Sequence, residues 1–359
     1  MSLASICILR LSALGDATHM VPMVRRLQAA HPQARITWII GKLEAKLVGD
    51  LAGVEFIPFD KKAGWAGLTA LRGQLAGRRF DVLLQCQLAL RASLMSTLIR
   101  ADRRIGYDRA RSREGHSLFI DERIAPTGFH VLDVLGEFAG ALGAPPAPPQ
   151  WDIAVSDWDR TVAADLLPGD QPTLLLSPAS SHTLRNWSAD RYAAVADHAV
   201  RRHGLRVALC GGRSALEREL ADAIATRMAT PPLDLVGRDT LKQFLALCQR
   251  SFALLTPDSG PMHMANTVGT PVLGLHAATD SRRSGPYSDL RWTVDRFAEA
   301  ARKYLRKSTD ELRWGTRIEY PGVMDLIAVD DVVERLDALV AARLDGESDR
   351  AQGPGPRAQ

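Results

Sequence analysis

The sequence has few cysteines and no histidine motif of the kind that binds metal. Its 359 residues include four cysteines, none in a CxxC pair, and nine histidines that form no HExxH or HxH group. Paired cysteines and closely spaced histidines are the usual signatures of disulfide frameworks and zinc sites. We therefore expect reduced cysteines in a protein core, no bound metal and no cofactor.

The sequence also lacks a long apolar run. No stretch approaches the ~20 apolar residues that span a bilayer. Arg10 interrupts the apolar start of the chain before a signal-peptide pattern develops. Both absences predict a soluble, non-secreted, cytoplasmic protein.

No large excess of one charge is present, because 45 Lys and Arg face 41 Asp and Glu, a net charge of +4. The charge is uneven: residues 1–150 carry 19 basic and 13 acidic side chains, net +6, which leaves 26 against 28, net −2. Aromatic residues make up only 6%, and no helix-turn-helix, RNP or zinc-finger pattern occurs. These observations argue against nucleic acid and favour an anionic small molecule or lipid headgroup for the first half.

Short apolar runs alternate with segments of helical periodicity along the whole chain, which predicts parallel α/β architecture. The expected strands lie at 5–11, 36–41, 54–59, 81–86, 173–178, 206–211, 233–237, 252–257 and 272–277. Four prolines within 143–150 predict an extended linker. The sequence thus predicts two Rossmann-like, doubly wound domains, with ligands at the carboxyl ends of the strands.

We expect the first domain over 1–146, the second over 147–345 and a disordered tail over 346–359. A charged, helical insertion is expected over 295–320. A final helix is expected over 330–344, either on the second domain or packed back on the first.

Asp16 follows the first expected strand and precedes a helix expected to begin near residue 17. An aspartate at this position is typical of a helix N-cap. A carboxylate at the carboxyl end of a strand can also act as a general base, and the two roles are compatible.

Hydroxyl groups and an arginine follow the expected strand 173–178, in the run Ser180, Ser181 and Arg185. A guanidinium and hydroxyls suit a phosphate-bearing ligand. The alternative is a solvated loop with Trp187 packed on the sheet.

A third loop, at 258–263, follows another expected strand and opens a helix. Free backbone N–H groups at a helix start bind phosphate, and Gly260 permits a close approach. A helix capped by Asp258 with Pro261 in its first turn is the alternative, but it does not account for His263. The Cys210-Gly211-Gly212 turn is not a GxGxxG motif, which argues against a nicotinamide dehydrogenase.

Together, the segments RLSALGDATHMVPM, SPASSHTLRNW, GGRSALEREL and TPDSGPMHMANTVGTPVLGL resemble glycosyltransferase family 9, the bacterial lipopolysaccharide heptosyltransferases, over nearly residues 5–290. The resemblance implies the two-domain GT-B fold, a nucleotide-sugar donor on the second domain and an acceptor on the first. It implies an inverting transfer, with ADP-heptose as donor and the anionic inner core of lipopolysaccharide, on lipid A, as acceptor. Peripheral contact with the inner membrane would follow from such an acceptor.

The resemblance also implies roles for individual residues. Asp16 matches the catalytic aspartate of the family. The implied donor-binding residues are Ser180, Ser181, Arg185, Glu217, Asp258, Ser259, Gly260, Pro261 and His263. The candidate acceptor contacts are Arg10, Arg113, Lys61 and Lys62, for which an ordinary solvated charge is the alternative.

Two departures from the family pattern put the identity of the sugar in doubt. The chain has His276-Ala277-Ala278-Thr279-Asp280 where the family commonly has a Gly-Pro-Thr-Asp turn, and the insertion at 295–320 is absent from the simplest members. The alternatives are a family-9 transferase that uses another nucleotide-sugar and a catalytically silent nucleotide-sugar-binding protein.

Overall fold

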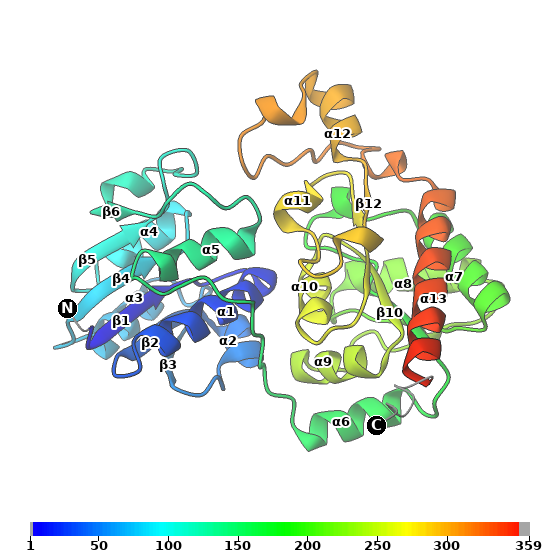
Figure 1. The fold of residues 1–359 in the computed structure, drawn as a ribbon, viewed down its shortest axis with the longest axis horizontal. Helices are drawn as coiled ribbons and strands as arrows, with labels where there is room; N and C mark the ends of the chain where they lie inside the picture. The colour runs from blue at the N-terminus through cyan, green and yellow to red at the C-terminus, as the bar shows by residue number, and fades with distance from the viewer. Residues whose placement is uncertain (1–2, 352–359) are drawn as a thin grey trace, which may run out of the picture.

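The structure, a computed structural model, describes residues 3–351. It contains two six-stranded parallel sheets, each covered by helices on both faces (Figure 1). Each of the predicted apolar runs forms a strand, so the predicted α/β class with two doubly wound domains is confirmed.

The first sheet has the strand order β3-β2-β1-β4-β5-β6. Its strands are β1 (Ser5–Leu9), β2 (Arg35–Gly41), β3 (Val54–Phe59), β4 (Phe80–Gln85), β5 (Ala101–Gly106) and β6 (Glu122–Arg123). The apolar pattern did not predict β5 and β6, because their facing side chains are charged: Arg103 donates to Glu122 at 2.7 and 2.8 Å. The order of the strands reverses between β1 and β4, where doubly wound sheets bind ligands.

Helices α1 (Leu14–Ala30), α2 (Lys42–Val48) and α5 (Val131–Gly140) pack on one face of this sheet, and α3 (Gly64–Gln74) and α4 (Leu90–Ser96) pack on the other. Helix α1 begins at Leu14, earlier than expected, and it contains Pro22.

The second sheet repeats this topology, with the order β12-β11-β10-β7-β8-β9. Its strands are β7 (Thr173–Leu176), β8 (Arg206–Leu209), β9 (Leu233–Asp234), β10 (Ala253–Pro257), β11 (Val272–His276) and β12 (Val294–Asp295). Helices α7 (Ala189–His203), α8 (Ala215–Arg227) and α13 (Val329–Ala351) cover one face, and α6 (Asp157–Leu166), α9 (Leu241–Arg250) and α10 (Gly260–Thr267) cover the other.

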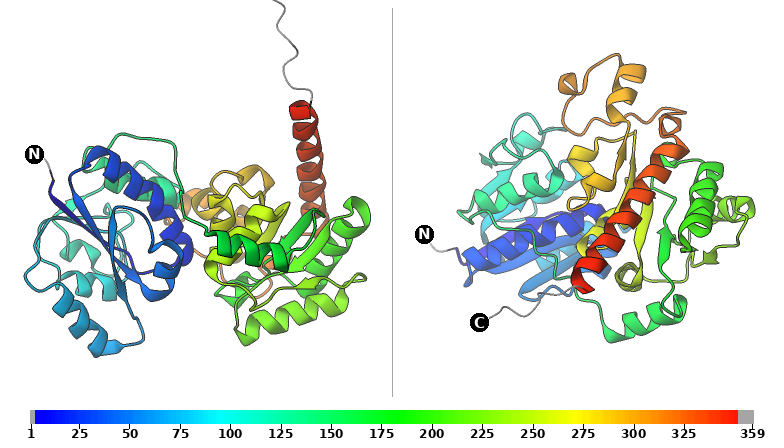
Figure 2. Two further views of the ribbon diagram at one scale, coloured as in Figure 1. Left: turned by 90° about the horizontal axis from the view of Figure 1, so that it is seen from below. Right: turned by 45° about the vertical axis from the view of Figure 1, so that its right-hand side comes forward.

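The two sheets flank a shared layer of helices, seen from a second side in Figure 2. Buried apolar side chains of α1 and α2 are continuous with those of α9 and α10. Polar contacts close the edges of the layer: Lys242 lies 2.9 Å from Asp50, and the Tyr287 hydroxyl donates to Asp133 at 2.8 Å. The carboxyl ends of β1 and β10 therefore meet across a contact between the domains.

The final helix packs in the core of the second domain. Helix α13 buries Val332, Leu336 and Leu339 in the core beside α7, because these positions share one face of the helix. It continues to Ala351, so residues 346–351 of the expected tail are helical, and 352–359 lie outside the described residues. Among residues 3–351, no helix is both long and apolar enough to cross a membrane.

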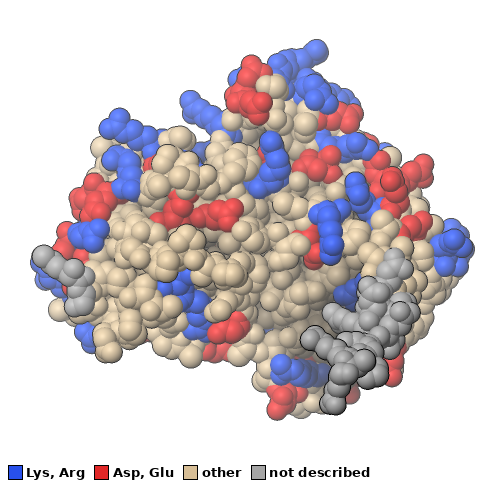
Figure 3. Space-filling view, viewed as in Figure 1, with Lys and Arg blue, Asp and Glu red and all other residues tan. Residues whose placement is uncertain are grey.

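The insertion at 295–320 is only partly helical. Helix α12 (Phe297–Ala300) continues into a π-helical turn at Ala301–Leu305, and after a short 3-10 turn at Thr309–Glu311 the chain is irregular. Basic side chains gather at the top of Figure 3, where Figure 1 places α12. The exposed basic residues of the insertion are Arg302, Lys303, Arg306, Lys307, Arg313 and Arg317.

Candidate active site

Asp16 lies in the first turn of α1, just beyond the carboxyl end of β1. Ala13 is the N-cap residue of the helix, and its backbone N–H donates to Oδ2 of Asp16 at 3.1 Å. The predicted N-cap position of Asp16 is therefore wrong by three residues, although its carboxylate does satisfy a free N–H of the helix start. Oδ1 of Asp16 has no partner among residues 3–351.

Arg10 forms an ion pair with Asp16 through the same Oδ2 atom. The guanidinium is held in place by the carbonyl of Cys86 and by the hydroxyl of Tyr107, the latter at 3.2 Å. Burial alone would raise the pKa of Asp16, but the charge of Arg10 and the hydrogen bond from Ala13 outweigh it and lower the pKa below its ordinary value. Arg10 thus orients the carboxylate and keeps it ionised.

The loop at 258–259 connects β10 to α10, and its side chains bond within the second domain. The Asp258 carboxylate accepts from the Ser284 hydroxyl at 3.2 Å and lies 3.8 Å from Nε2 of His263. Burial alone would raise the pKa of Asp258, but the bond with His263 and the charges of nearby histidines and Arg185 hold it well below its usual range. Ser259 is the N-cap residue, its hydroxyl lies 2.9 Å from that of Thr256, and Pro261 occupies the first turn.

Two glycines allow α1 and α10 to meet at their N-termini. A Cβ atom on Gly15 would lie 2.2 Å from Cδ2 of His263, and one on Gly260 would lie 3.3 Å from Cβ of Leu14. Real Cβ atoms do not approach to 2.2 Å, so glycine at position 15 lets the ring of His263 lie directly on the backbone beside Asp16. The structure thus brings the first and third predicted loops together from different domains.

Sequence reasoning missed two histidines at this contact, His19 and His130. The ring centroid of His19 lies 4.5 Å from that of His263 and 5.4 Å from that of His130. Burial, with the charges of the other two rings, lowers the pKa of His19 well below its ordinary value, and burial lowers that of His130 to about 4. One signal was available for His19: it lies three residues after Asp16, on the same helical face.

The second predicted loop contributes a buried arginine that is already paired. Nε and a terminal nitrogen of Arg185 both donate to Oε1 of Glu319, at 2.8 and 2.5 Å. The hydroxyl of Ser180 donates to the carbonyl of His182 at 2.8 Å, whereas Ser181 is exposed. Trp187 is buried, as the alternative interpretation of this loop expected.

Glu217 lies in the first turn of α8 and closes the turn that precedes it. Its carboxylate accepts from the Gly212 N–H at 2.7 Å and from the Ser214 hydroxyl at 2.6 Å. Through these bonds, Glu217 caps the start of α8 and closes the turn that follows β8.

The predicted acceptor contacts on the first domain occupy different environments. Nζ of Lys61 lies 3.0 Å from Oε1 of the buried Glu44, whereas the side chain of Lys62 is exposed. Arg113 donates to the backbone carbonyl of Trp314, a residue of the insertion.

Arg283 is the most informative residue that sequence reasoning missed. Its charge acts on both Asp16 and Asp258, and burial lowers the pKa of its own guanidinium. The guanidinium lies 4.3 Å from the ring of Trp314, and Nε has no partner among the residues described. Trp314 also donates through Nε1 to the Phe129 carbonyl at 2.7 Å, so the insertion crosses to the first domain. An unpaired guanidinium nitrogen buried at this contact is suited to an anionic ligand.

Comparison with known proteins agrees with this geometry. Residues 68–314 match the family described as glycosyltransferase family 9 (heptosyltransferase). The chain is 39% identical over 336 residues to the lipopolysaccharide core heptosyltransferase OpsX of Haemophilus influenzae, an alignment that covers 93% of this chain and 96% of that relative.

Two solved structures share the fold. The family 9 glycosyl transferase of Veillonella parvula superposes with a TM-score of 0.79 at 22% identity, covering 95% of this chain and 99% of that one. The Escherichia coli ADP-heptose lps heptosyltransferase II superposes with a TM-score of 0.69 at 21% identity, covering 94% and 99%. The predicted GT-B architecture is confirmed, and the chain belongs to glycosyltransferase family 9, the heptosyltransferases.

Proposed function

We propose that the protein transfers heptose from ADP-heptose to the inner core of lipopolysaccharide, with inversion at the anomeric carbon. The observation that carries the proposal is the juxtaposition of Asp16, whose Oδ1 has no partner in the described chain, with the start of α10 on the other domain. Family membership and 39% identity to OpsX, a lipopolysaccharide core heptosyltransferase, support heptose as the sugar.

The donor diphosphate is proposed to bind at Arg185 and the N-terminus of α10. Backbone N–H groups at a helix start and an arginine fork are both strong ligands for phosphate oxygens. Because Glu319 neutralises Arg185 in this structure, an entering diphosphate competes with Glu319 for the guanidinium.

Asp16 is proposed to act as the general base. The acceptor hydroxyl would lie between Oδ1 of Asp16 and the anomeric carbon, with the nucleotide diphosphate leaving on the opposite face. A carboxylate with a lowered pKa cannot deprotonate an alcohol in advance, so the proton moves late, as the oxocarbenium-like centre makes the hydroxyl acidic. Base catalysis of this kind contributes ~10²–10⁴-fold.

Negative charge that develops on the leaving diphosphate needs stabilisation, and arginine side chains can provide it. Arg185 lies in the loop that follows β7, and the charge of Arg283 acts on both Asp16 and Asp258. Arg185 is buried, and so is the Nε atom of Arg283, which strengthens their interaction with a charged ligand.

Arginines from both domains support an anionic acceptor. A Cβ atom on Gly315 would lie 3.2 Å from Nε of Arg283 and 3.4 Å from a terminal nitrogen of Arg113, so the two guanidiniums flank the same turn. Arg317 follows on this turn, and its charge acts on Arg283. The carboxylates and phosphates of a lipopolysaccharide core are the anions that such a group of arginines would bind.

We also propose that the protein makes peripheral contact with the inner membrane. Helices α3 and α4 cover one sheet face, and Trp65 at the start of α3 and Leu94 within α4 are 85% and 54% exposed. Leu118 is 85% exposed on a segment tied to α4 by the 2.7 Å bond from the Leu90 N–H to Glu114. Exposed basic residues in and beside these segments include Lys62, Arg72, Arg91, Arg109 and Arg113. Apolar and basic side chains together favour an anionic lipid surface.

Vesicle flotation tests this contact. Wild-type protein is expected to float with anionic vesicles more than with neutral ones, and the double variant Trp65→Ser, Leu118→Ser is expected to lose most of that binding. Trp158→Ser, which alters an exposed tryptophan on α6, is the matched control. Equal binding by both variants would contradict the assigned surface.

The transfer reaction is tested with a donor panel. Purified protein is incubated with ADP-, UDP- and GDP-sugars and lipid A precursors that carry 3-deoxy-octulosonate, and products are identified by mass. The expected product gains one heptose from ADP-heptose only. Transfer from another donor would identify a family-9 enzyme of different specificity, and donor binding without turnover of any acceptor would identify a silent binding protein.

A further inference from the structure

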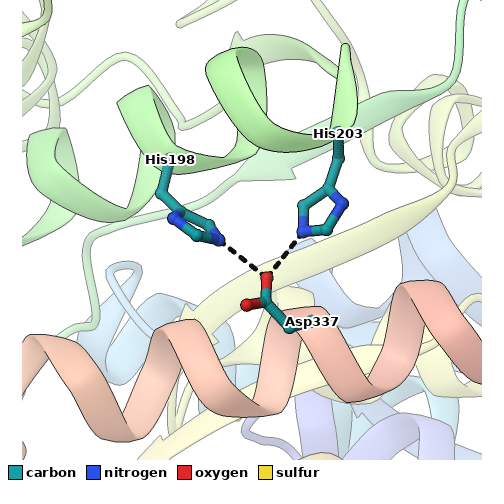
Figure 4. A group of neighbouring side chains, drawn as sticks. All are labelled: His198, His203 and Asp337. Carbon is teal, nitrogen blue, oxygen red and sulfur yellow. Dashed lines mark hydrogen bonds and ion pairs between the residues drawn. The ribbon is translucent and has the colours of Figure 1, made fainter.

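Two histidines and an aspartate converge on the side of the second domain away from the first (Figure 4). His198 and His203 lie in the last turns of α7, and Asp337 lies on α13. Nε2 of each imidazole points at Oδ1 of Asp337, at 2.7 and 2.6 Å. No spacing in the sequence indicates the cluster, because Asp337 is 134 positions beyond His203.

The chemistry and orientation of these groups suit a divalent transition metal. The potential ligand atoms all lie within 4.8 Å of one another. The imidazole planes are 71° apart with centroids at 5.5 Å, so the rings converge on one point rather than stack. Imidazole nitrogens with one carboxylate oxygen form a ligand set typical of Zn²⁺, which accepts three protein ligands and a water molecule.

The surroundings permit an ion to enter. The side chain of Asp337 is 43% exposed and that of His198 is 25% exposed, so solvent reaches the cluster. Among residues 3–344, whose side chains the structure describes, no lysine or arginine pairs with Asp337, and its partners are the two imidazoles. A metal ion therefore meets a carboxylate whose charge is not already neutralised by a fixed cation.

We propose that His198, His203 and Asp337 form a binding site for Zn²⁺ or a similar transition-metal ion that joins α13 to α7. Tetrahedral zinc bonds of ~2.1 Å place ligand atoms ~3.4 Å apart. Nε2 of each histidine now lies 2.7 or 2.6 Å from Oδ1 of Asp337, and small rotations of the side chains would separate these atoms to that spacing. To bind the metal, Nε2 of each imidazole must carry no proton. The proton that each Nε2 shares with Asp337 therefore moves to Nδ1 of the same ring or to solvent.

The ion would act on stability and not on transfer. Helix α7 carries the buried Tyr192 and Val195 in the core of the second domain, and α13 covers the same face. A metal bridge fixes the C-terminal helix to this core at a place remote from Asp16. The inference does not depend on the proposed heptosyl transfer.

The test uses full-length protein without a histidine tag, freed of metal by chelation and dialysis. Titration calorimetry with Zn²⁺ is expected to show one equivalent bound, and Co²⁺ is expected to give the intense visible absorption of a tetrahedral site. Asp337→Asn and His203→Gln each remove one ligand and should weaken Zn²⁺ by at least ~100-fold, more than the loss of residues that only support a ligand. His31→Gln, which alters a partly buried histidine bonded to the Leu142 carbonyl, should bind as wild type.

Thermal unfolding gives an independent readout. At free Zn²⁺ near ~100 times the dissociation constant, the folding equilibrium shifts by ~100-fold, so the melting temperature rises in wild type and in His31→Gln but not in Asp337→Asn. Circular dichroism verifies that each variant is folded, and His198→Gln replaces any that is not. Absence of binding, or binding that all variants retain, would show that the cluster is a hydrogen-bonded triad only and would overturn the proposal.

Discussion

Glu319 holds Arg185 through a single carboxylate oxygen, which accepts from Nε at 2.8 Å and from a terminal nitrogen at 2.5 Å. Glu319 belongs to the insertion at 295–320 and Arg185 to the loop after β7, so the insertion holds a residue of the proposed donor site. The pair is largely buried, and an incoming diphosphate must displace or share this carboxylate.

This relationship predicts opposite effects for two substitutions. Arg185→Ala should weaken ADP-heptose binding by about 10- to 150-fold, which corresponds to the ~1.5–3 kcal/mol of a charge-assisted hydrogen bond. Glu319→Gln keeps the shape of the side chain but removes the competing charge, so donor affinity should rise. Calorimetry with each variant checks both. Unchanged affinity in Arg185→Ala would remove this arginine from the donor site.

The assignment of Asp16 predicts a loss confined to turnover. Asp16→Asn keeps an oxygen that can accept from the Ala13 N–H but cannot take a proton, so turnover should fall by ~10²-fold or more while donor affinity changes little. Because Arg10 loses its ion-pair partner, some thermal stability should be lost as well. Melting temperature, donor binding and turnover are measured together for Asp16→Asn and Asp16→Ala. If Asn retained more than about a tenth of the wild-type turnover, Asp16 would not be the base.

The lowered pKa of Asp16 predicts how activity depends on acid. A carboxyl whose pKa lies below its ordinary value stays ionised to lower pH, so protonation of Asp16 should not reduce kcat/KM as the pH falls from 8 to 5. Arg10→Gln removes the charge that opposes burial, so the pKa should rise and the acid limb of kcat/KM should move to higher pH. Profiles of the two proteins that coincide would contradict this role of Arg10.

The buried histidines predict that acid lowers the stability of the fold. The pKa of His130 falls from 6.5 to about 4 in the fold, because burial disfavours the imidazolium. Between these values the unfolded chain binds a proton that the folded chain does not, so stability is present above pH 6.5 and is lost as the pH falls toward 4, by up to ~1.4 kcal/mol per pH unit for each such histidine.

His130→Asn tests this dependence. In wild type, Nδ1 of His130 accepts from the Leu132 N–H at 3.1 Å at the start of α5, and asparagine is also a good N-cap residue. The variant cannot titrate, so its melting temperature should vary less than that of wild type between pH 7 and pH 5. An unchanged slope would mean that His130 is not protonated on unfolding in this range.

The sequence predicted the architecture and the loops of the site because both depend on local patterns. Apolar runs mark the buried strands, and the polar residues that follow them mark the carboxyl edge of each sheet. The contact between Gly15 and His263 and the pairing of Arg185 with Glu319 depend on how distant segments pack, which periodicity does not record.

Adjacent arginines show this limit well. Arg282 and Arg283 are indistinguishable in the sequence, yet the first is 57% exposed on its side chain and pairs with Asp280, whereas the second is half-buried, with its Nε atom buried, at the candidate site. Which of them lies at the candidate site is set by the four-residue helix α11 (Ser281–Ser284) and by the insertion, whose Trp314 contacts Arg283.

The same pair provides the sharpest test of the anion-binding arginines. Arg283→Ala removes a guanidinium whose charge acts on Asp16 and Asp258 and whose Nε has no partner in the described part of the chain, so the acceptor Michaelis constant should rise by about 10- to 150-fold, the range of a lost charge-assisted bond. Arg282→Ala removes an equal charge one residue away and should change it by less than about threefold, because an exposed pair is worth ~0–1 kcal/mol. Steady-state kinetics over a range of salt concentrations compare the two, since salt should weaken acceptor binding more in wild type than in Arg283→Ala. Equal effects of the two substitutions would mean that the acceptor responds to net charge alone, and that the buried position of Arg283 has no role in recognition.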